Sequence, residues 1–179
     1  MKVRMCKMRY AKIRSMDISN GEGIGISLFV QGCHFHCKGC FNQETWDFDG
    51  GKEWTKDVRS KFIQLADKDF ITRISILGGE PLETQNVTEI LSLIEELKQT
   101  YPNKKIWLYT GYTWDYIKKC TIETPLGLPL LRYNIFKNVD YVVEGLFDIK
   151  KQDLFNNEIV FAGSTNQKII QTKDLDFKY

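Results

Sequence analysis

The chain has 179 residues, of which 42% are hydrophobic and 27% are charged, with a formal net charge of +2. These values disfavour disordered, collagen-like and coiled-coil proteins, and the length excludes a complete eight-unit β/α barrel, which needs about 250 residues. The mixed charges indicate no broad surface for nucleic acid, and no apolar run is long enough to span a membrane. We therefore expect one soluble, cytoplasmic domain over residues 1–179, with its core at 18–170 and a loosely ordered tail at 171–179.

Short apolar, β-prone runs alternate with amphipathic segments along the chain. In chain order we expect a strand at 26–31, a helix at 55–67, a strand at 73–77, a helix at 86–101, a strand at 105–109, a helix at 113–119, a loop at 124–131 that leads into 132–137, a strand at 139–143, and two short strands at 159–162 and 168–170. Thr55 is placed to cap the first helix, and Asn86 with Glu89 has the pattern of a capping box at the second. The alternation predicts an α/β fold with parallel strands and right-handed crossovers.

A motif rich in cysteine, glycine or polar residues follows each of the four main predicted strands. These motifs are the cysteine cluster after 26–31, Gly78-Gly79-Glu80-Pro81 after 73–77, Thr110-Gly111-Tyr112 after 105–109, and Glu144-Gly145 after 139–143. The carboxyl ends of parallel strands share one edge of a sheet or partial barrel, where α/β enzymes assemble their sites. We therefore expect the four motifs to converge.

The cysteines follow the pattern C-x3-C-x2-C at Cys33, Cys37 and Cys40. Three thiolates on one short loop leave one position of a metal centre open, which suits a [4Fe-4S] cluster with an iron free to bind a substrate. A structural zinc site needs a fourth protein ligand, and His34 or His36 could serve as one. A ferredoxin-type electron carrier has another spacing and a further cysteine. The spacing favours the open [4Fe-4S] site and leaves zinc as the alternative.

The cysteine motif, followed by the aromatic Phe41, resembles the signature of radical S-adenosylmethionine (SAM) enzymes. Within that family, the chain between about residues 18 and 168 resembles the activating proteins of anaerobic (class III) ribonucleoside-triphosphate reductases. The motifs that carry this resemblance are Asn20-Gly21-Glu22-Gly23, Leu28 to Cys33, Asn42, Thr45-Trp46, Gly78 to Leu82, Thr110-Gly111-Tyr112 and Gly163-Ser164-Thr165-Asn166-Gln167. The sequence departs from some members, which carry an arginine at the position of Gly25.

The resemblance implies a partial, open β/α barrel of about five to six units. It also implies that Cys33, Cys37 and Cys40 hold a [4Fe-4S] cluster, where SAM is split with one electron from reduced flavodoxin or a similar donor. The products would be methionine and a 5'-deoxyadenosyl radical, and the radical would take a hydrogen atom from a glycine Cα of the reductase. No catalytic residue is expected beyond the ligands of the cluster and of SAM. The open side of the barrel would admit the reductase.

The resemblance places SAM contacts on three motifs: Gly39, Cys40 and Phe41; Gly78, Gly79 and Glu80; and Thr110. Glycine permits close backbone approach, and an aromatic ring can cover the adenine. Two alternatives remain, namely that Phe41 belongs to the core and that the Gly-Gly-Glu-Pro segment is an ordinary turn between a strand and a helix.

Two polar loops suggest further hypotheses. The amides of Asn166 and Gln167 can both donate and accept, so we hypothesise that they hold the backbone of the reductase's glycine loop, with a self-satisfied turn as the alternative. The glycine-rich segment 20–25 lacks a phosphate-binding pattern and is expected to form a flexible lip beside the cluster. Cys6 and Cys120 lie far from the motif and are expected to be ordinary, partly buried residues.

Two other functions stay open from the sequence. An activating enzyme for a different glycyl-radical enzyme, of the pyruvate formate-lyase type, would share the cysteine loop. A zinc-stabilised binding module would use the same cysteines without catalysis.

Overall fold

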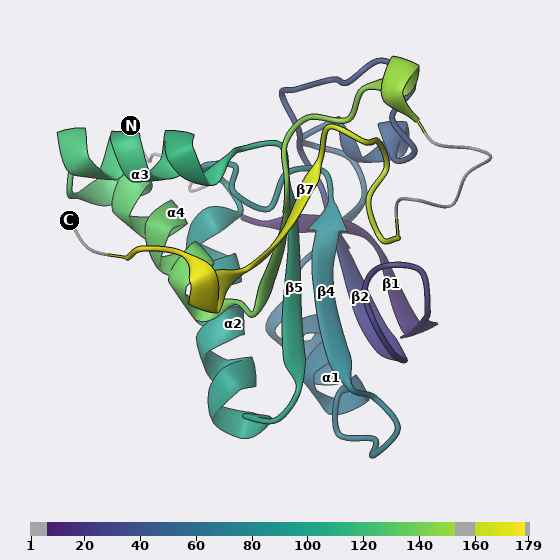
Figure 1. Ribbon diagram of the computed structural model, residues 1–179. Helices are drawn as coiled ribbons and strands as arrows, with labels where there is room; N and C mark the ends of the chain where they lie inside the picture. Colours follow the sequence, from purple (N-terminus) through teal and green to yellow (C-terminus); the bar gives the residue numbers. More distant parts are fainter. Residues whose placement is uncertain (1–6, 153–159, 178–179) are drawn as a thin grey trace, which may run out of the picture.

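A mixed sheet organises the part of the chain that the computed structural model describes, residues 7–152 and 160–177. Within these residues, seven strands follow the order β3-β1-β2-β4-β5-β6-β7 (Figure 1). The strands are β1 Arg9–Asp17, β2 Gly25–Val30, β3 Lys52–Glu53, β4 Arg73–Gly78, β5 Lys105–Thr110, β6 Tyr141–Glu144 and β7 Lys168–Gln171. The helices are α1 Lys56–Leu65, α2 Val87–Thr100, α3 Trp114–Glu123 and α4 Gly127–Asn138, with short 3-10 helices at η1 Gln43–Thr45, η2 Ile149–Lys151 and η3 Thr172–Asp174.

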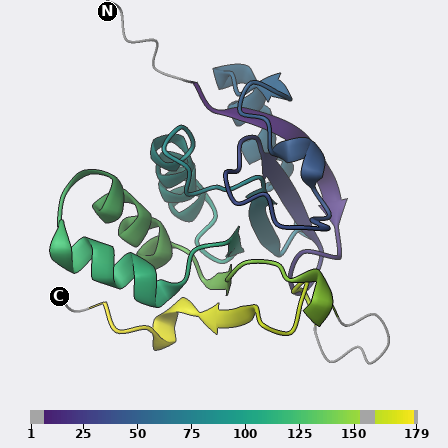
Figure 2. The same ribbon diagram turned by 90° about the horizontal axis from the view of Figure 1, so that it is seen from above.

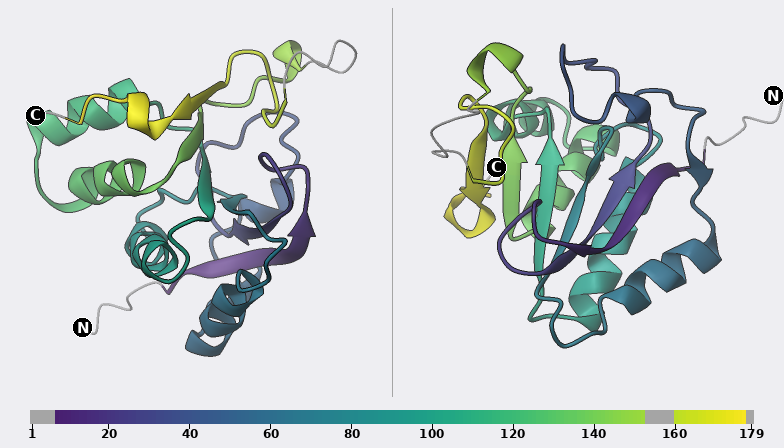
Figure 3. Two further views of the ribbon diagram at one scale, coloured as in Figure 1. Left: turned by 60° about the horizontal axis from the view of Figure 1, so that its bottom comes forward. Right: turned by 90° about the vertical axis from the view of Figure 1, so that its right-hand side faces the viewer.

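The central strands run parallel, and their order explains where the helices lie. The sheet contains β2, β4, β5 and β6 side by side in the same order as in the sequence, and each neighbouring pair is parallel. Because crossovers between parallel strands are right-handed, a chain that always advances in one direction places every crossover helix on the same face. Figures 2 and 3 show the helices gathered on one side of the sheet. The predicted α/β class with parallel strands is confirmed, and β1, β3 and β7 add antiparallel pairs at the edges.

Alternate residues of the parallel strands face opposite sides of the sheet. Ile26 pairs with Ile74 and Leu28 with Ile76 across β2 and β4, and all four are fully buried in the core beneath the helices. The residues between them, such as Ser75, face the other side, because side chains along a strand alternate with a period of two. Polar residues on the strands can therefore be buried without entering the apolar core.

The loop predicted at 124–131 is wrong from Gly127 onward, because α4 begins there. Two prolines and a glycine in this segment, Pro125, Gly127 and Pro129, favoured a loop over a helix. Pro129, however, is the third residue of α4, where a backbone N–H has no partner inside the helix, so a proline does not interrupt the hydrogen bonds. A proline in the first turn of a helix is mistaken for a loop residue when the start of the helix is not recognised in the sequence.

Helix capping follows the prediction at α1 but not at α2. The Thr55 hydroxyl accepts a hydrogen bond from the Val58 N–H at 3.3 Å, as expected for an N-cap. Asn86 makes no capping bond. Its buried amide instead donates to the carbonyls of Gln31 (2.9 Å) and Glu80 (3.0 Å), so it joins the ends of β2 and β4. The predicted capping box is absent because this residue serves a long-range contact.

The segment 171–177 is packed rather than loosely ordered. Thr172 is buried, and its hydroxyl contacts the Val139 carbonyl. Phe177 lies edge-on to Trp114, with ring centroids 4.9 Å apart, and its carbonyl accepts a hydrogen bond from the Tyr133 hydroxyl. The charges of this segment concealed two apolar residues, Leu175 and Phe177, which pack against the core, with Phe177 on Trp114 of α3 and Tyr133 of α4.

The C-terminal region also covers the edge of β6. The strand predicted at 168–170 corresponds to β7, which pairs antiparallel with β6. Of the strand predicted at 159–162, residue 159 lies outside the described residues, and 160–162 are not in a strand. β7 therefore occupies the sheet edge at which a further β/α unit would continue. No helix among the described residues is long and apolar enough to cross a membrane.

Candidate functional site

The four motifs predicted to converge line one cavity at the carboxyl ends of the parallel strands. The cavity has a volume of about 440 Å³, and its walls include the three cysteines, Gly78 to Glu80, Thr110-Gly111 and Gly145. Ser19 and Asn20 also line it, although they precede the amino end of β2. The cavity thus extends down the face of the sheet that the helices leave uncovered, with the cysteines at one end and Ser19 and Asn20 as its floor.

Backbone hydrogen bonds shape the cysteine loop. The N–H of Gly32 donates to the Thr45 carbonyl at 2.8 Å, and the N–H of Cys33 donates to the Trp46 carbonyl at 3.1 Å. His36 has a positive φ of 47° and stacks on Trp46, with ring centroids 4.7 Å apart. These contacts close the loop between β2 and η1, and Trp46 packs against it.

The cysteine sulfur atoms are partly buried and accept hydrogen bonds from backbone N–H groups. Burial raises the pKa of the Cys33 thiol to about 11, and the nearby Glu80 and Cys37 act in the same direction. Backbone N–H groups also point at the sulfurs: Phe35 and His36 donate to Cys33, Phe147 donates to Cys37, and Asn42 donates to Cys40 at 3.4 Å. Such donors are a general means by which proteins tune the potential of a cluster.

The described residues include no group of three or more His, Cys, Asp or Glu side chains that converge on a single ion. Neither histidine turns toward the cysteines as a fourth ligand: His34 Nδ1 contacts Glu83 Oε1, and His36 stacks on Trp46. Three thiols around one cavity therefore fit a cluster with one open iron.

Glu80 braces the ends of β4 and β5 against each other. Its carboxylate accepts hydrogen bonds from the Leu82 N–H (2.9 Å), the Thr110 hydroxyl (2.8 Å) and the Gly111 N–H (2.8 Å). Burial raises the pKa of Glu80 to about 7, although these donors oppose the shift. Glu80 and Thr110 both line the cavity, but the bonds found here are to the chain itself. Their contact with SAM stays a prediction.

Two glycines of the predicted SAM site make room for neighbouring parts of the chain. A Cβ at Gly79 would lie 2.4 Å from the Gly32 carbonyl oxygen, so this glycine lets the Gly-Gly-Glu loop pack on the cysteine loop. Gly39 has a φ of +75°, and a Cβ there would clash with the Ile149 side chain. The structure thus supplies packing reasons for both glycines in addition to any approach of a ligand.

Phe41 is not a core residue, because 63% of its surface is exposed. Its ring lies 5.1 Å from that of Phe147, at the wall of the cavity. This excludes the alternative that Phe41 belongs to the apolar core. The cover over an adenine ring stays a prediction.

The amides of the 163–167 loop are engaged with the chain itself. Asn166 Nδ2 donates to the Leu146 carbonyl at 2.8 Å, and Gln167 Nε2 donates to the Gly145 carbonyl at 2.9 Å. Gln167 Oε1 accepts from the Gly163 N–H at 2.8 Å, and Gln167 lines the cavity. The loop therefore has the bonds of a self-satisfied turn, and contact with a partner's glycine loop stays a prediction.

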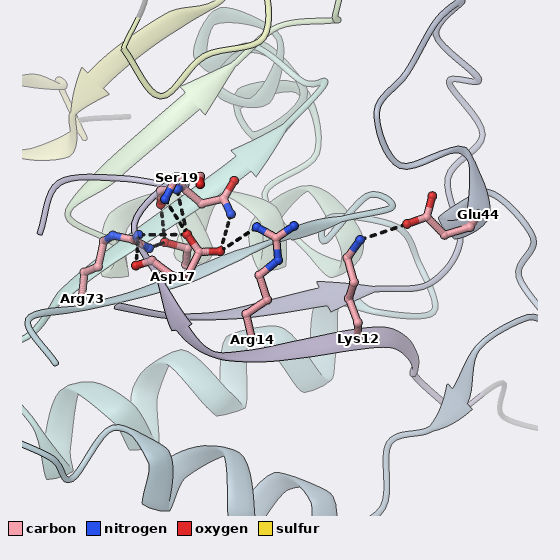
Figure 4. A network of polar contacts seen from close by, with 8 residues as sticks. Lys12, Arg14, Asp17, Ser19, Glu44 and Arg73 are labelled. Carbon is pink, nitrogen blue, oxygen red and sulfur yellow. Dashed lines mark hydrogen bonds and ion pairs between the residues drawn. The ribbon is translucent and has the colours of Figure 1, made fainter. Parts of the chain in front are cut away.

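The floor of the cavity contains charged residues that sequence reasoning missed. Arg73 is fully buried and bonded to Asp17, and Arg14, which lines the cavity, also bonds Asp17 (Figure 4). Asn20 is thus held in the floor by its hydrogen bonds to Asp17, and the flexible lip expected beside the cluster stays a prediction for residues 21–24. The Arg73 side chain occupies the space above Gly25. An arginine at the start of an otherwise apolar strand was the signal that could have identified this network.

Comparisons with known proteins agree with the cysteine site. A family model described as a 4Fe-4S single cluster domain matches residues 19–170. A Vibrio cholerae protein is 40% identical over 164 residues, which are 90% of this chain and 97% of that protein. An Escherichia coli K12 protein is 33% identical with the same coverage, and a phage T4 protein is 32% identical over 172 residues, 96% of this chain and 99% of that protein. All three are named anaerobic ribonucleoside-triphosphate reductase-activating protein.

Proposed function

The chain belongs to the family of anaerobic ribonucleoside-triphosphate reductase-activating proteins, and on this basis we propose that it installs a glycyl radical on such a reductase. When bound, a [4Fe-4S] cluster and SAM supply the chemistry: one electron splits SAM into methionine and a 5'-deoxyadenosyl radical, which takes a hydrogen atom from a glycine Cα and becomes 5'-deoxyadenosine. The observation that carries the proposal is the convergence of three cysteine thiols with the Gly78–Glu80 segment at one cavity.

Cys33, Cys37 and Cys40 would each bind one iron, which leaves the fourth iron without a protein ligand. The N–H groups that point at Cys33, Cys37 and Cys40 stabilise negative charge on sulfur. One of them, from Phe147, comes from the segment after β6, so the far side of the sheet contributes to the environment of the cluster.

All of the predicted SAM contacts except Gly39 line the same cavity, and the chain holds them in place. Gly39, Cys40 and Phe41 would contact SAM from the cysteine loop, while Gly78, Gly79, Glu80 and Thr110 would do so from the ends of β4 and β5. The three donors on the Glu80 carboxylate fix the Gly-Gly-Glu backbone relative to Thr110. The walls of the cavity would exclude water from a reactive radical.

The uncovered face of the sheet supports an open, partial barrel that admits part of another protein. The parallel strands advance in one direction across the sheet, whose two edges are β3 and β7. We propose that the single domain acts in the cytoplasm and takes its electron from reduced flavodoxin or a similar donor. If Asn166 and Gln167 hold the reductase's glycine loop, they must exchange their bonds to Leu146 and Gly145 for bonds to the partner.

The test is anaerobic reconstitution with iron and sulfide, followed by reduction with SAM and the reductase. Electron paramagnetic resonance should show a glycyl doublet on the reductase. Cys40→Ala should lose both iron and doublet, whereas Cys120→Ala, a free cysteine outside the cavity, should keep both.

Two other outcomes of this experiment would each indicate a different function. Cleavage of SAM without a doublet on the reductase, together with a doublet on a pyruvate formate-lyase-type enzyme, would indicate an activase of that enzyme. A colourless protein that takes up zinc but no iron and sulfide would indicate a binding module.

A further inference from the structure

A buried ion pair lies directly beneath the floor of the cavity. The side chains of Arg73 on β4 and Asp17 at the end of β1 are both completely buried. Arg73 Nη2 donates to the Asp17 carbonyl at 2.7 Å and to its Oδ1 at 3.1 Å, while Nη1 donates to the Ser75 hydroxyl at 2.6 Å (Figure 4). Charged groups are rarely buried without a specific partner, and the proposed function assigns no role to this pair.

The pair fixes the two residues that form the floor. Asp17 Oδ1 accepts hydrogen bonds from the backbone N–H groups of Ser19 (2.8 Å) and Asn20 (3.0 Å), and Oδ2 accepts from Asn20 Nδ2 at 2.7 Å. The Asn20 carbonyl in turn accepts from the Ser75 hydroxyl at 2.5 Å. Ser19 and Asn20 both line the cavity. The guanidinium therefore acts on the cavity through Asp17 and Ser75, without touching its contents.

The space around Arg73 shows that the guanidinium could come from either of two strands. Gly25 stands directly opposite Arg73 across β2 and β4, and registered residues on neighbouring strands share one face of the sheet. A Cβ at Gly25 would lie 2.8 Å from Arg73 Nη1. The glycine thus leaves room for the Arg73 side chain. A Cβ at position 25 would also lie 2.8 Å from the carbonyl oxygen of residue 73, so an arginine at position 25 would enter the same space only once residue 73 were small and that carbonyl had shifted by a few tenths of an ångström.

We propose that Arg73 is a positioning residue, which holds the Ser19–Asn20 floor at the depth that keeps SAM and the partner's glycine segment in reacting geometry. The identity of these ligands rests on the proposed function, whereas the support of the floor rests on the hydrogen bonds above. The guanidinium group supports the floor, and the strand from which it extends does not matter for this support. A guanidinium moved to position 25 should therefore replace it.

The test compares the wild-type protein with Arg73→Lys, Arg73→Gly and the double variant Gly25→Arg/Arg73→Gly. Hydrogen exchange of the Ser19 and Asn20 amides in the cofactor-free protein reports the floor directly. SAM affinity and the ratio of 5'-deoxyadenosine to glycyl radical report its effect on the ligands. The matched control is Arg59→Lys, because Arg59 also bonds two carboxylates, Glu89 and Glu96, but it lies on α1 and links that helix to α2, away from the cavity.

We expect the two single Arg73 variants to exchange these amides at least about tenfold faster, to bind SAM about tenfold more weakly and to form more 5'-deoxyadenosine per glycyl radical. The double variant should return all three quantities to within about twofold of wild type. Arg59→Lys should lower thermal stability and leave the three quantities unchanged.

The proposal is overturned if folded Arg73→Lys keeps wild-type exchange, affinity and ratio, or if the double variant is as impaired as Arg73→Gly. If both single variants fail to fold, a folded double variant with protected floor amides supports the proposal, and an unfolded one overturns it. A wild-type protein that yields no glycyl doublet would refute the proposed function, yet the exchange measurement would still decide whether Arg73 holds the floor.

Discussion

Replacing Gly79 with alanine should force apart the two loops that carry the cysteines and the Gly-Gly-Glu motif. The added Cβ would lie 2.4 Å from the Gly32 carbonyl oxygen and 3.0 Å from that of Thr45. Both neighbours are backbone atoms, so no side-chain rotation relieves the overlap. The backbone must move by at least about 0.6 Å before the Gly32 contact reaches the shortest separation that Cβ atoms adopt.

The expected loss combines two effects. Overpacking of this kind lowers the free energy of unfolding by about 1–3 kcal/mol. The same movement lengthens the hydrogen bond from the Glu80 N–H to the Gly32 carbonyl, now 2.8 Å, and that bond contributes roughly 1 kcal/mol. Together these effects amount to about 2–4 kcal/mol, which corresponds to a fall of roughly 4–16 °C in melting temperature for a domain of this size.

Thermal unfolding of the cofactor-free protein, followed by circular dichroism, measures this effect. Gly163→Ala is the control, because the three atoms nearest to a Cβ at Gly163 all belong to side chains, those of Phe147, Gln167 and Phe41, at 3.0–3.3 Å. The control should melt close to wild type. A Gly79→Ala protein that melts within about 1 °C of wild type would refute the close packing of the two loops.

Three further predictions concern the floor, the tail and a buried hydroxyl. Burial alone would raise the pKa of Asp17, but hydrogen bonds from Ser19, Asn20 and Arg73 hold it well below its usual range. The ionised carboxylate therefore stabilises the fold above about pH 4, and this contribution is lost as the pH falls. Asp17→Asn should flatten the decline in melting temperature between about pH 5 and 3. An unchanged decline would contradict the pairing of Asp17 with Arg73. Phe177→Ala should lower the free energy of unfolding by about 1–3 kcal/mol in urea titrations, and no loss would mean that the tail is not docked. Tyr109 has a buried hydroxyl with no hydrogen-bond partner among the described residues, so Tyr109→Phe should melt at or slightly above the wild-type temperature, and a clear fall would reveal an unseen partner.

The convergence of the motifs could be predicted because it depends on local patterns. Apolar runs of strand length and helical stripes between them define parallel β/α units, and the geometry of such units brings their carboxyl ends together. Cys33, Gly79 and Thr110 could therefore be assigned to one site from their positions after successive strands. The three cysteines also indicated their own chemistry, because their spacing on one loop limits the metal centres that they can hold.

Contacts between distant segments could not be predicted in the same way. Asn86 looked like a helix cap, yet its amide joins Gln31 to Glu80. Phe177 looked like part of a charged tail, yet it packs on Trp114. In each case the local pattern was compatible with two structures, and a partner far away in the chain selected one of them.

The sequence by itself determined the class of fold, the cysteine site and the set of loops that would surround it, because each depends on spacing within a short segment. Only the tertiary structure decided the floor of the cavity, where Asp17 and Arg73 meet across 56 positions of the chain. A buried ion pair is stable only when both charges leave water together, so neither residue alone reveals it. The buried Arg73 side chain also needs space, and Gly25, opposite Arg73 in the sheet, provides it because it has no Cβ.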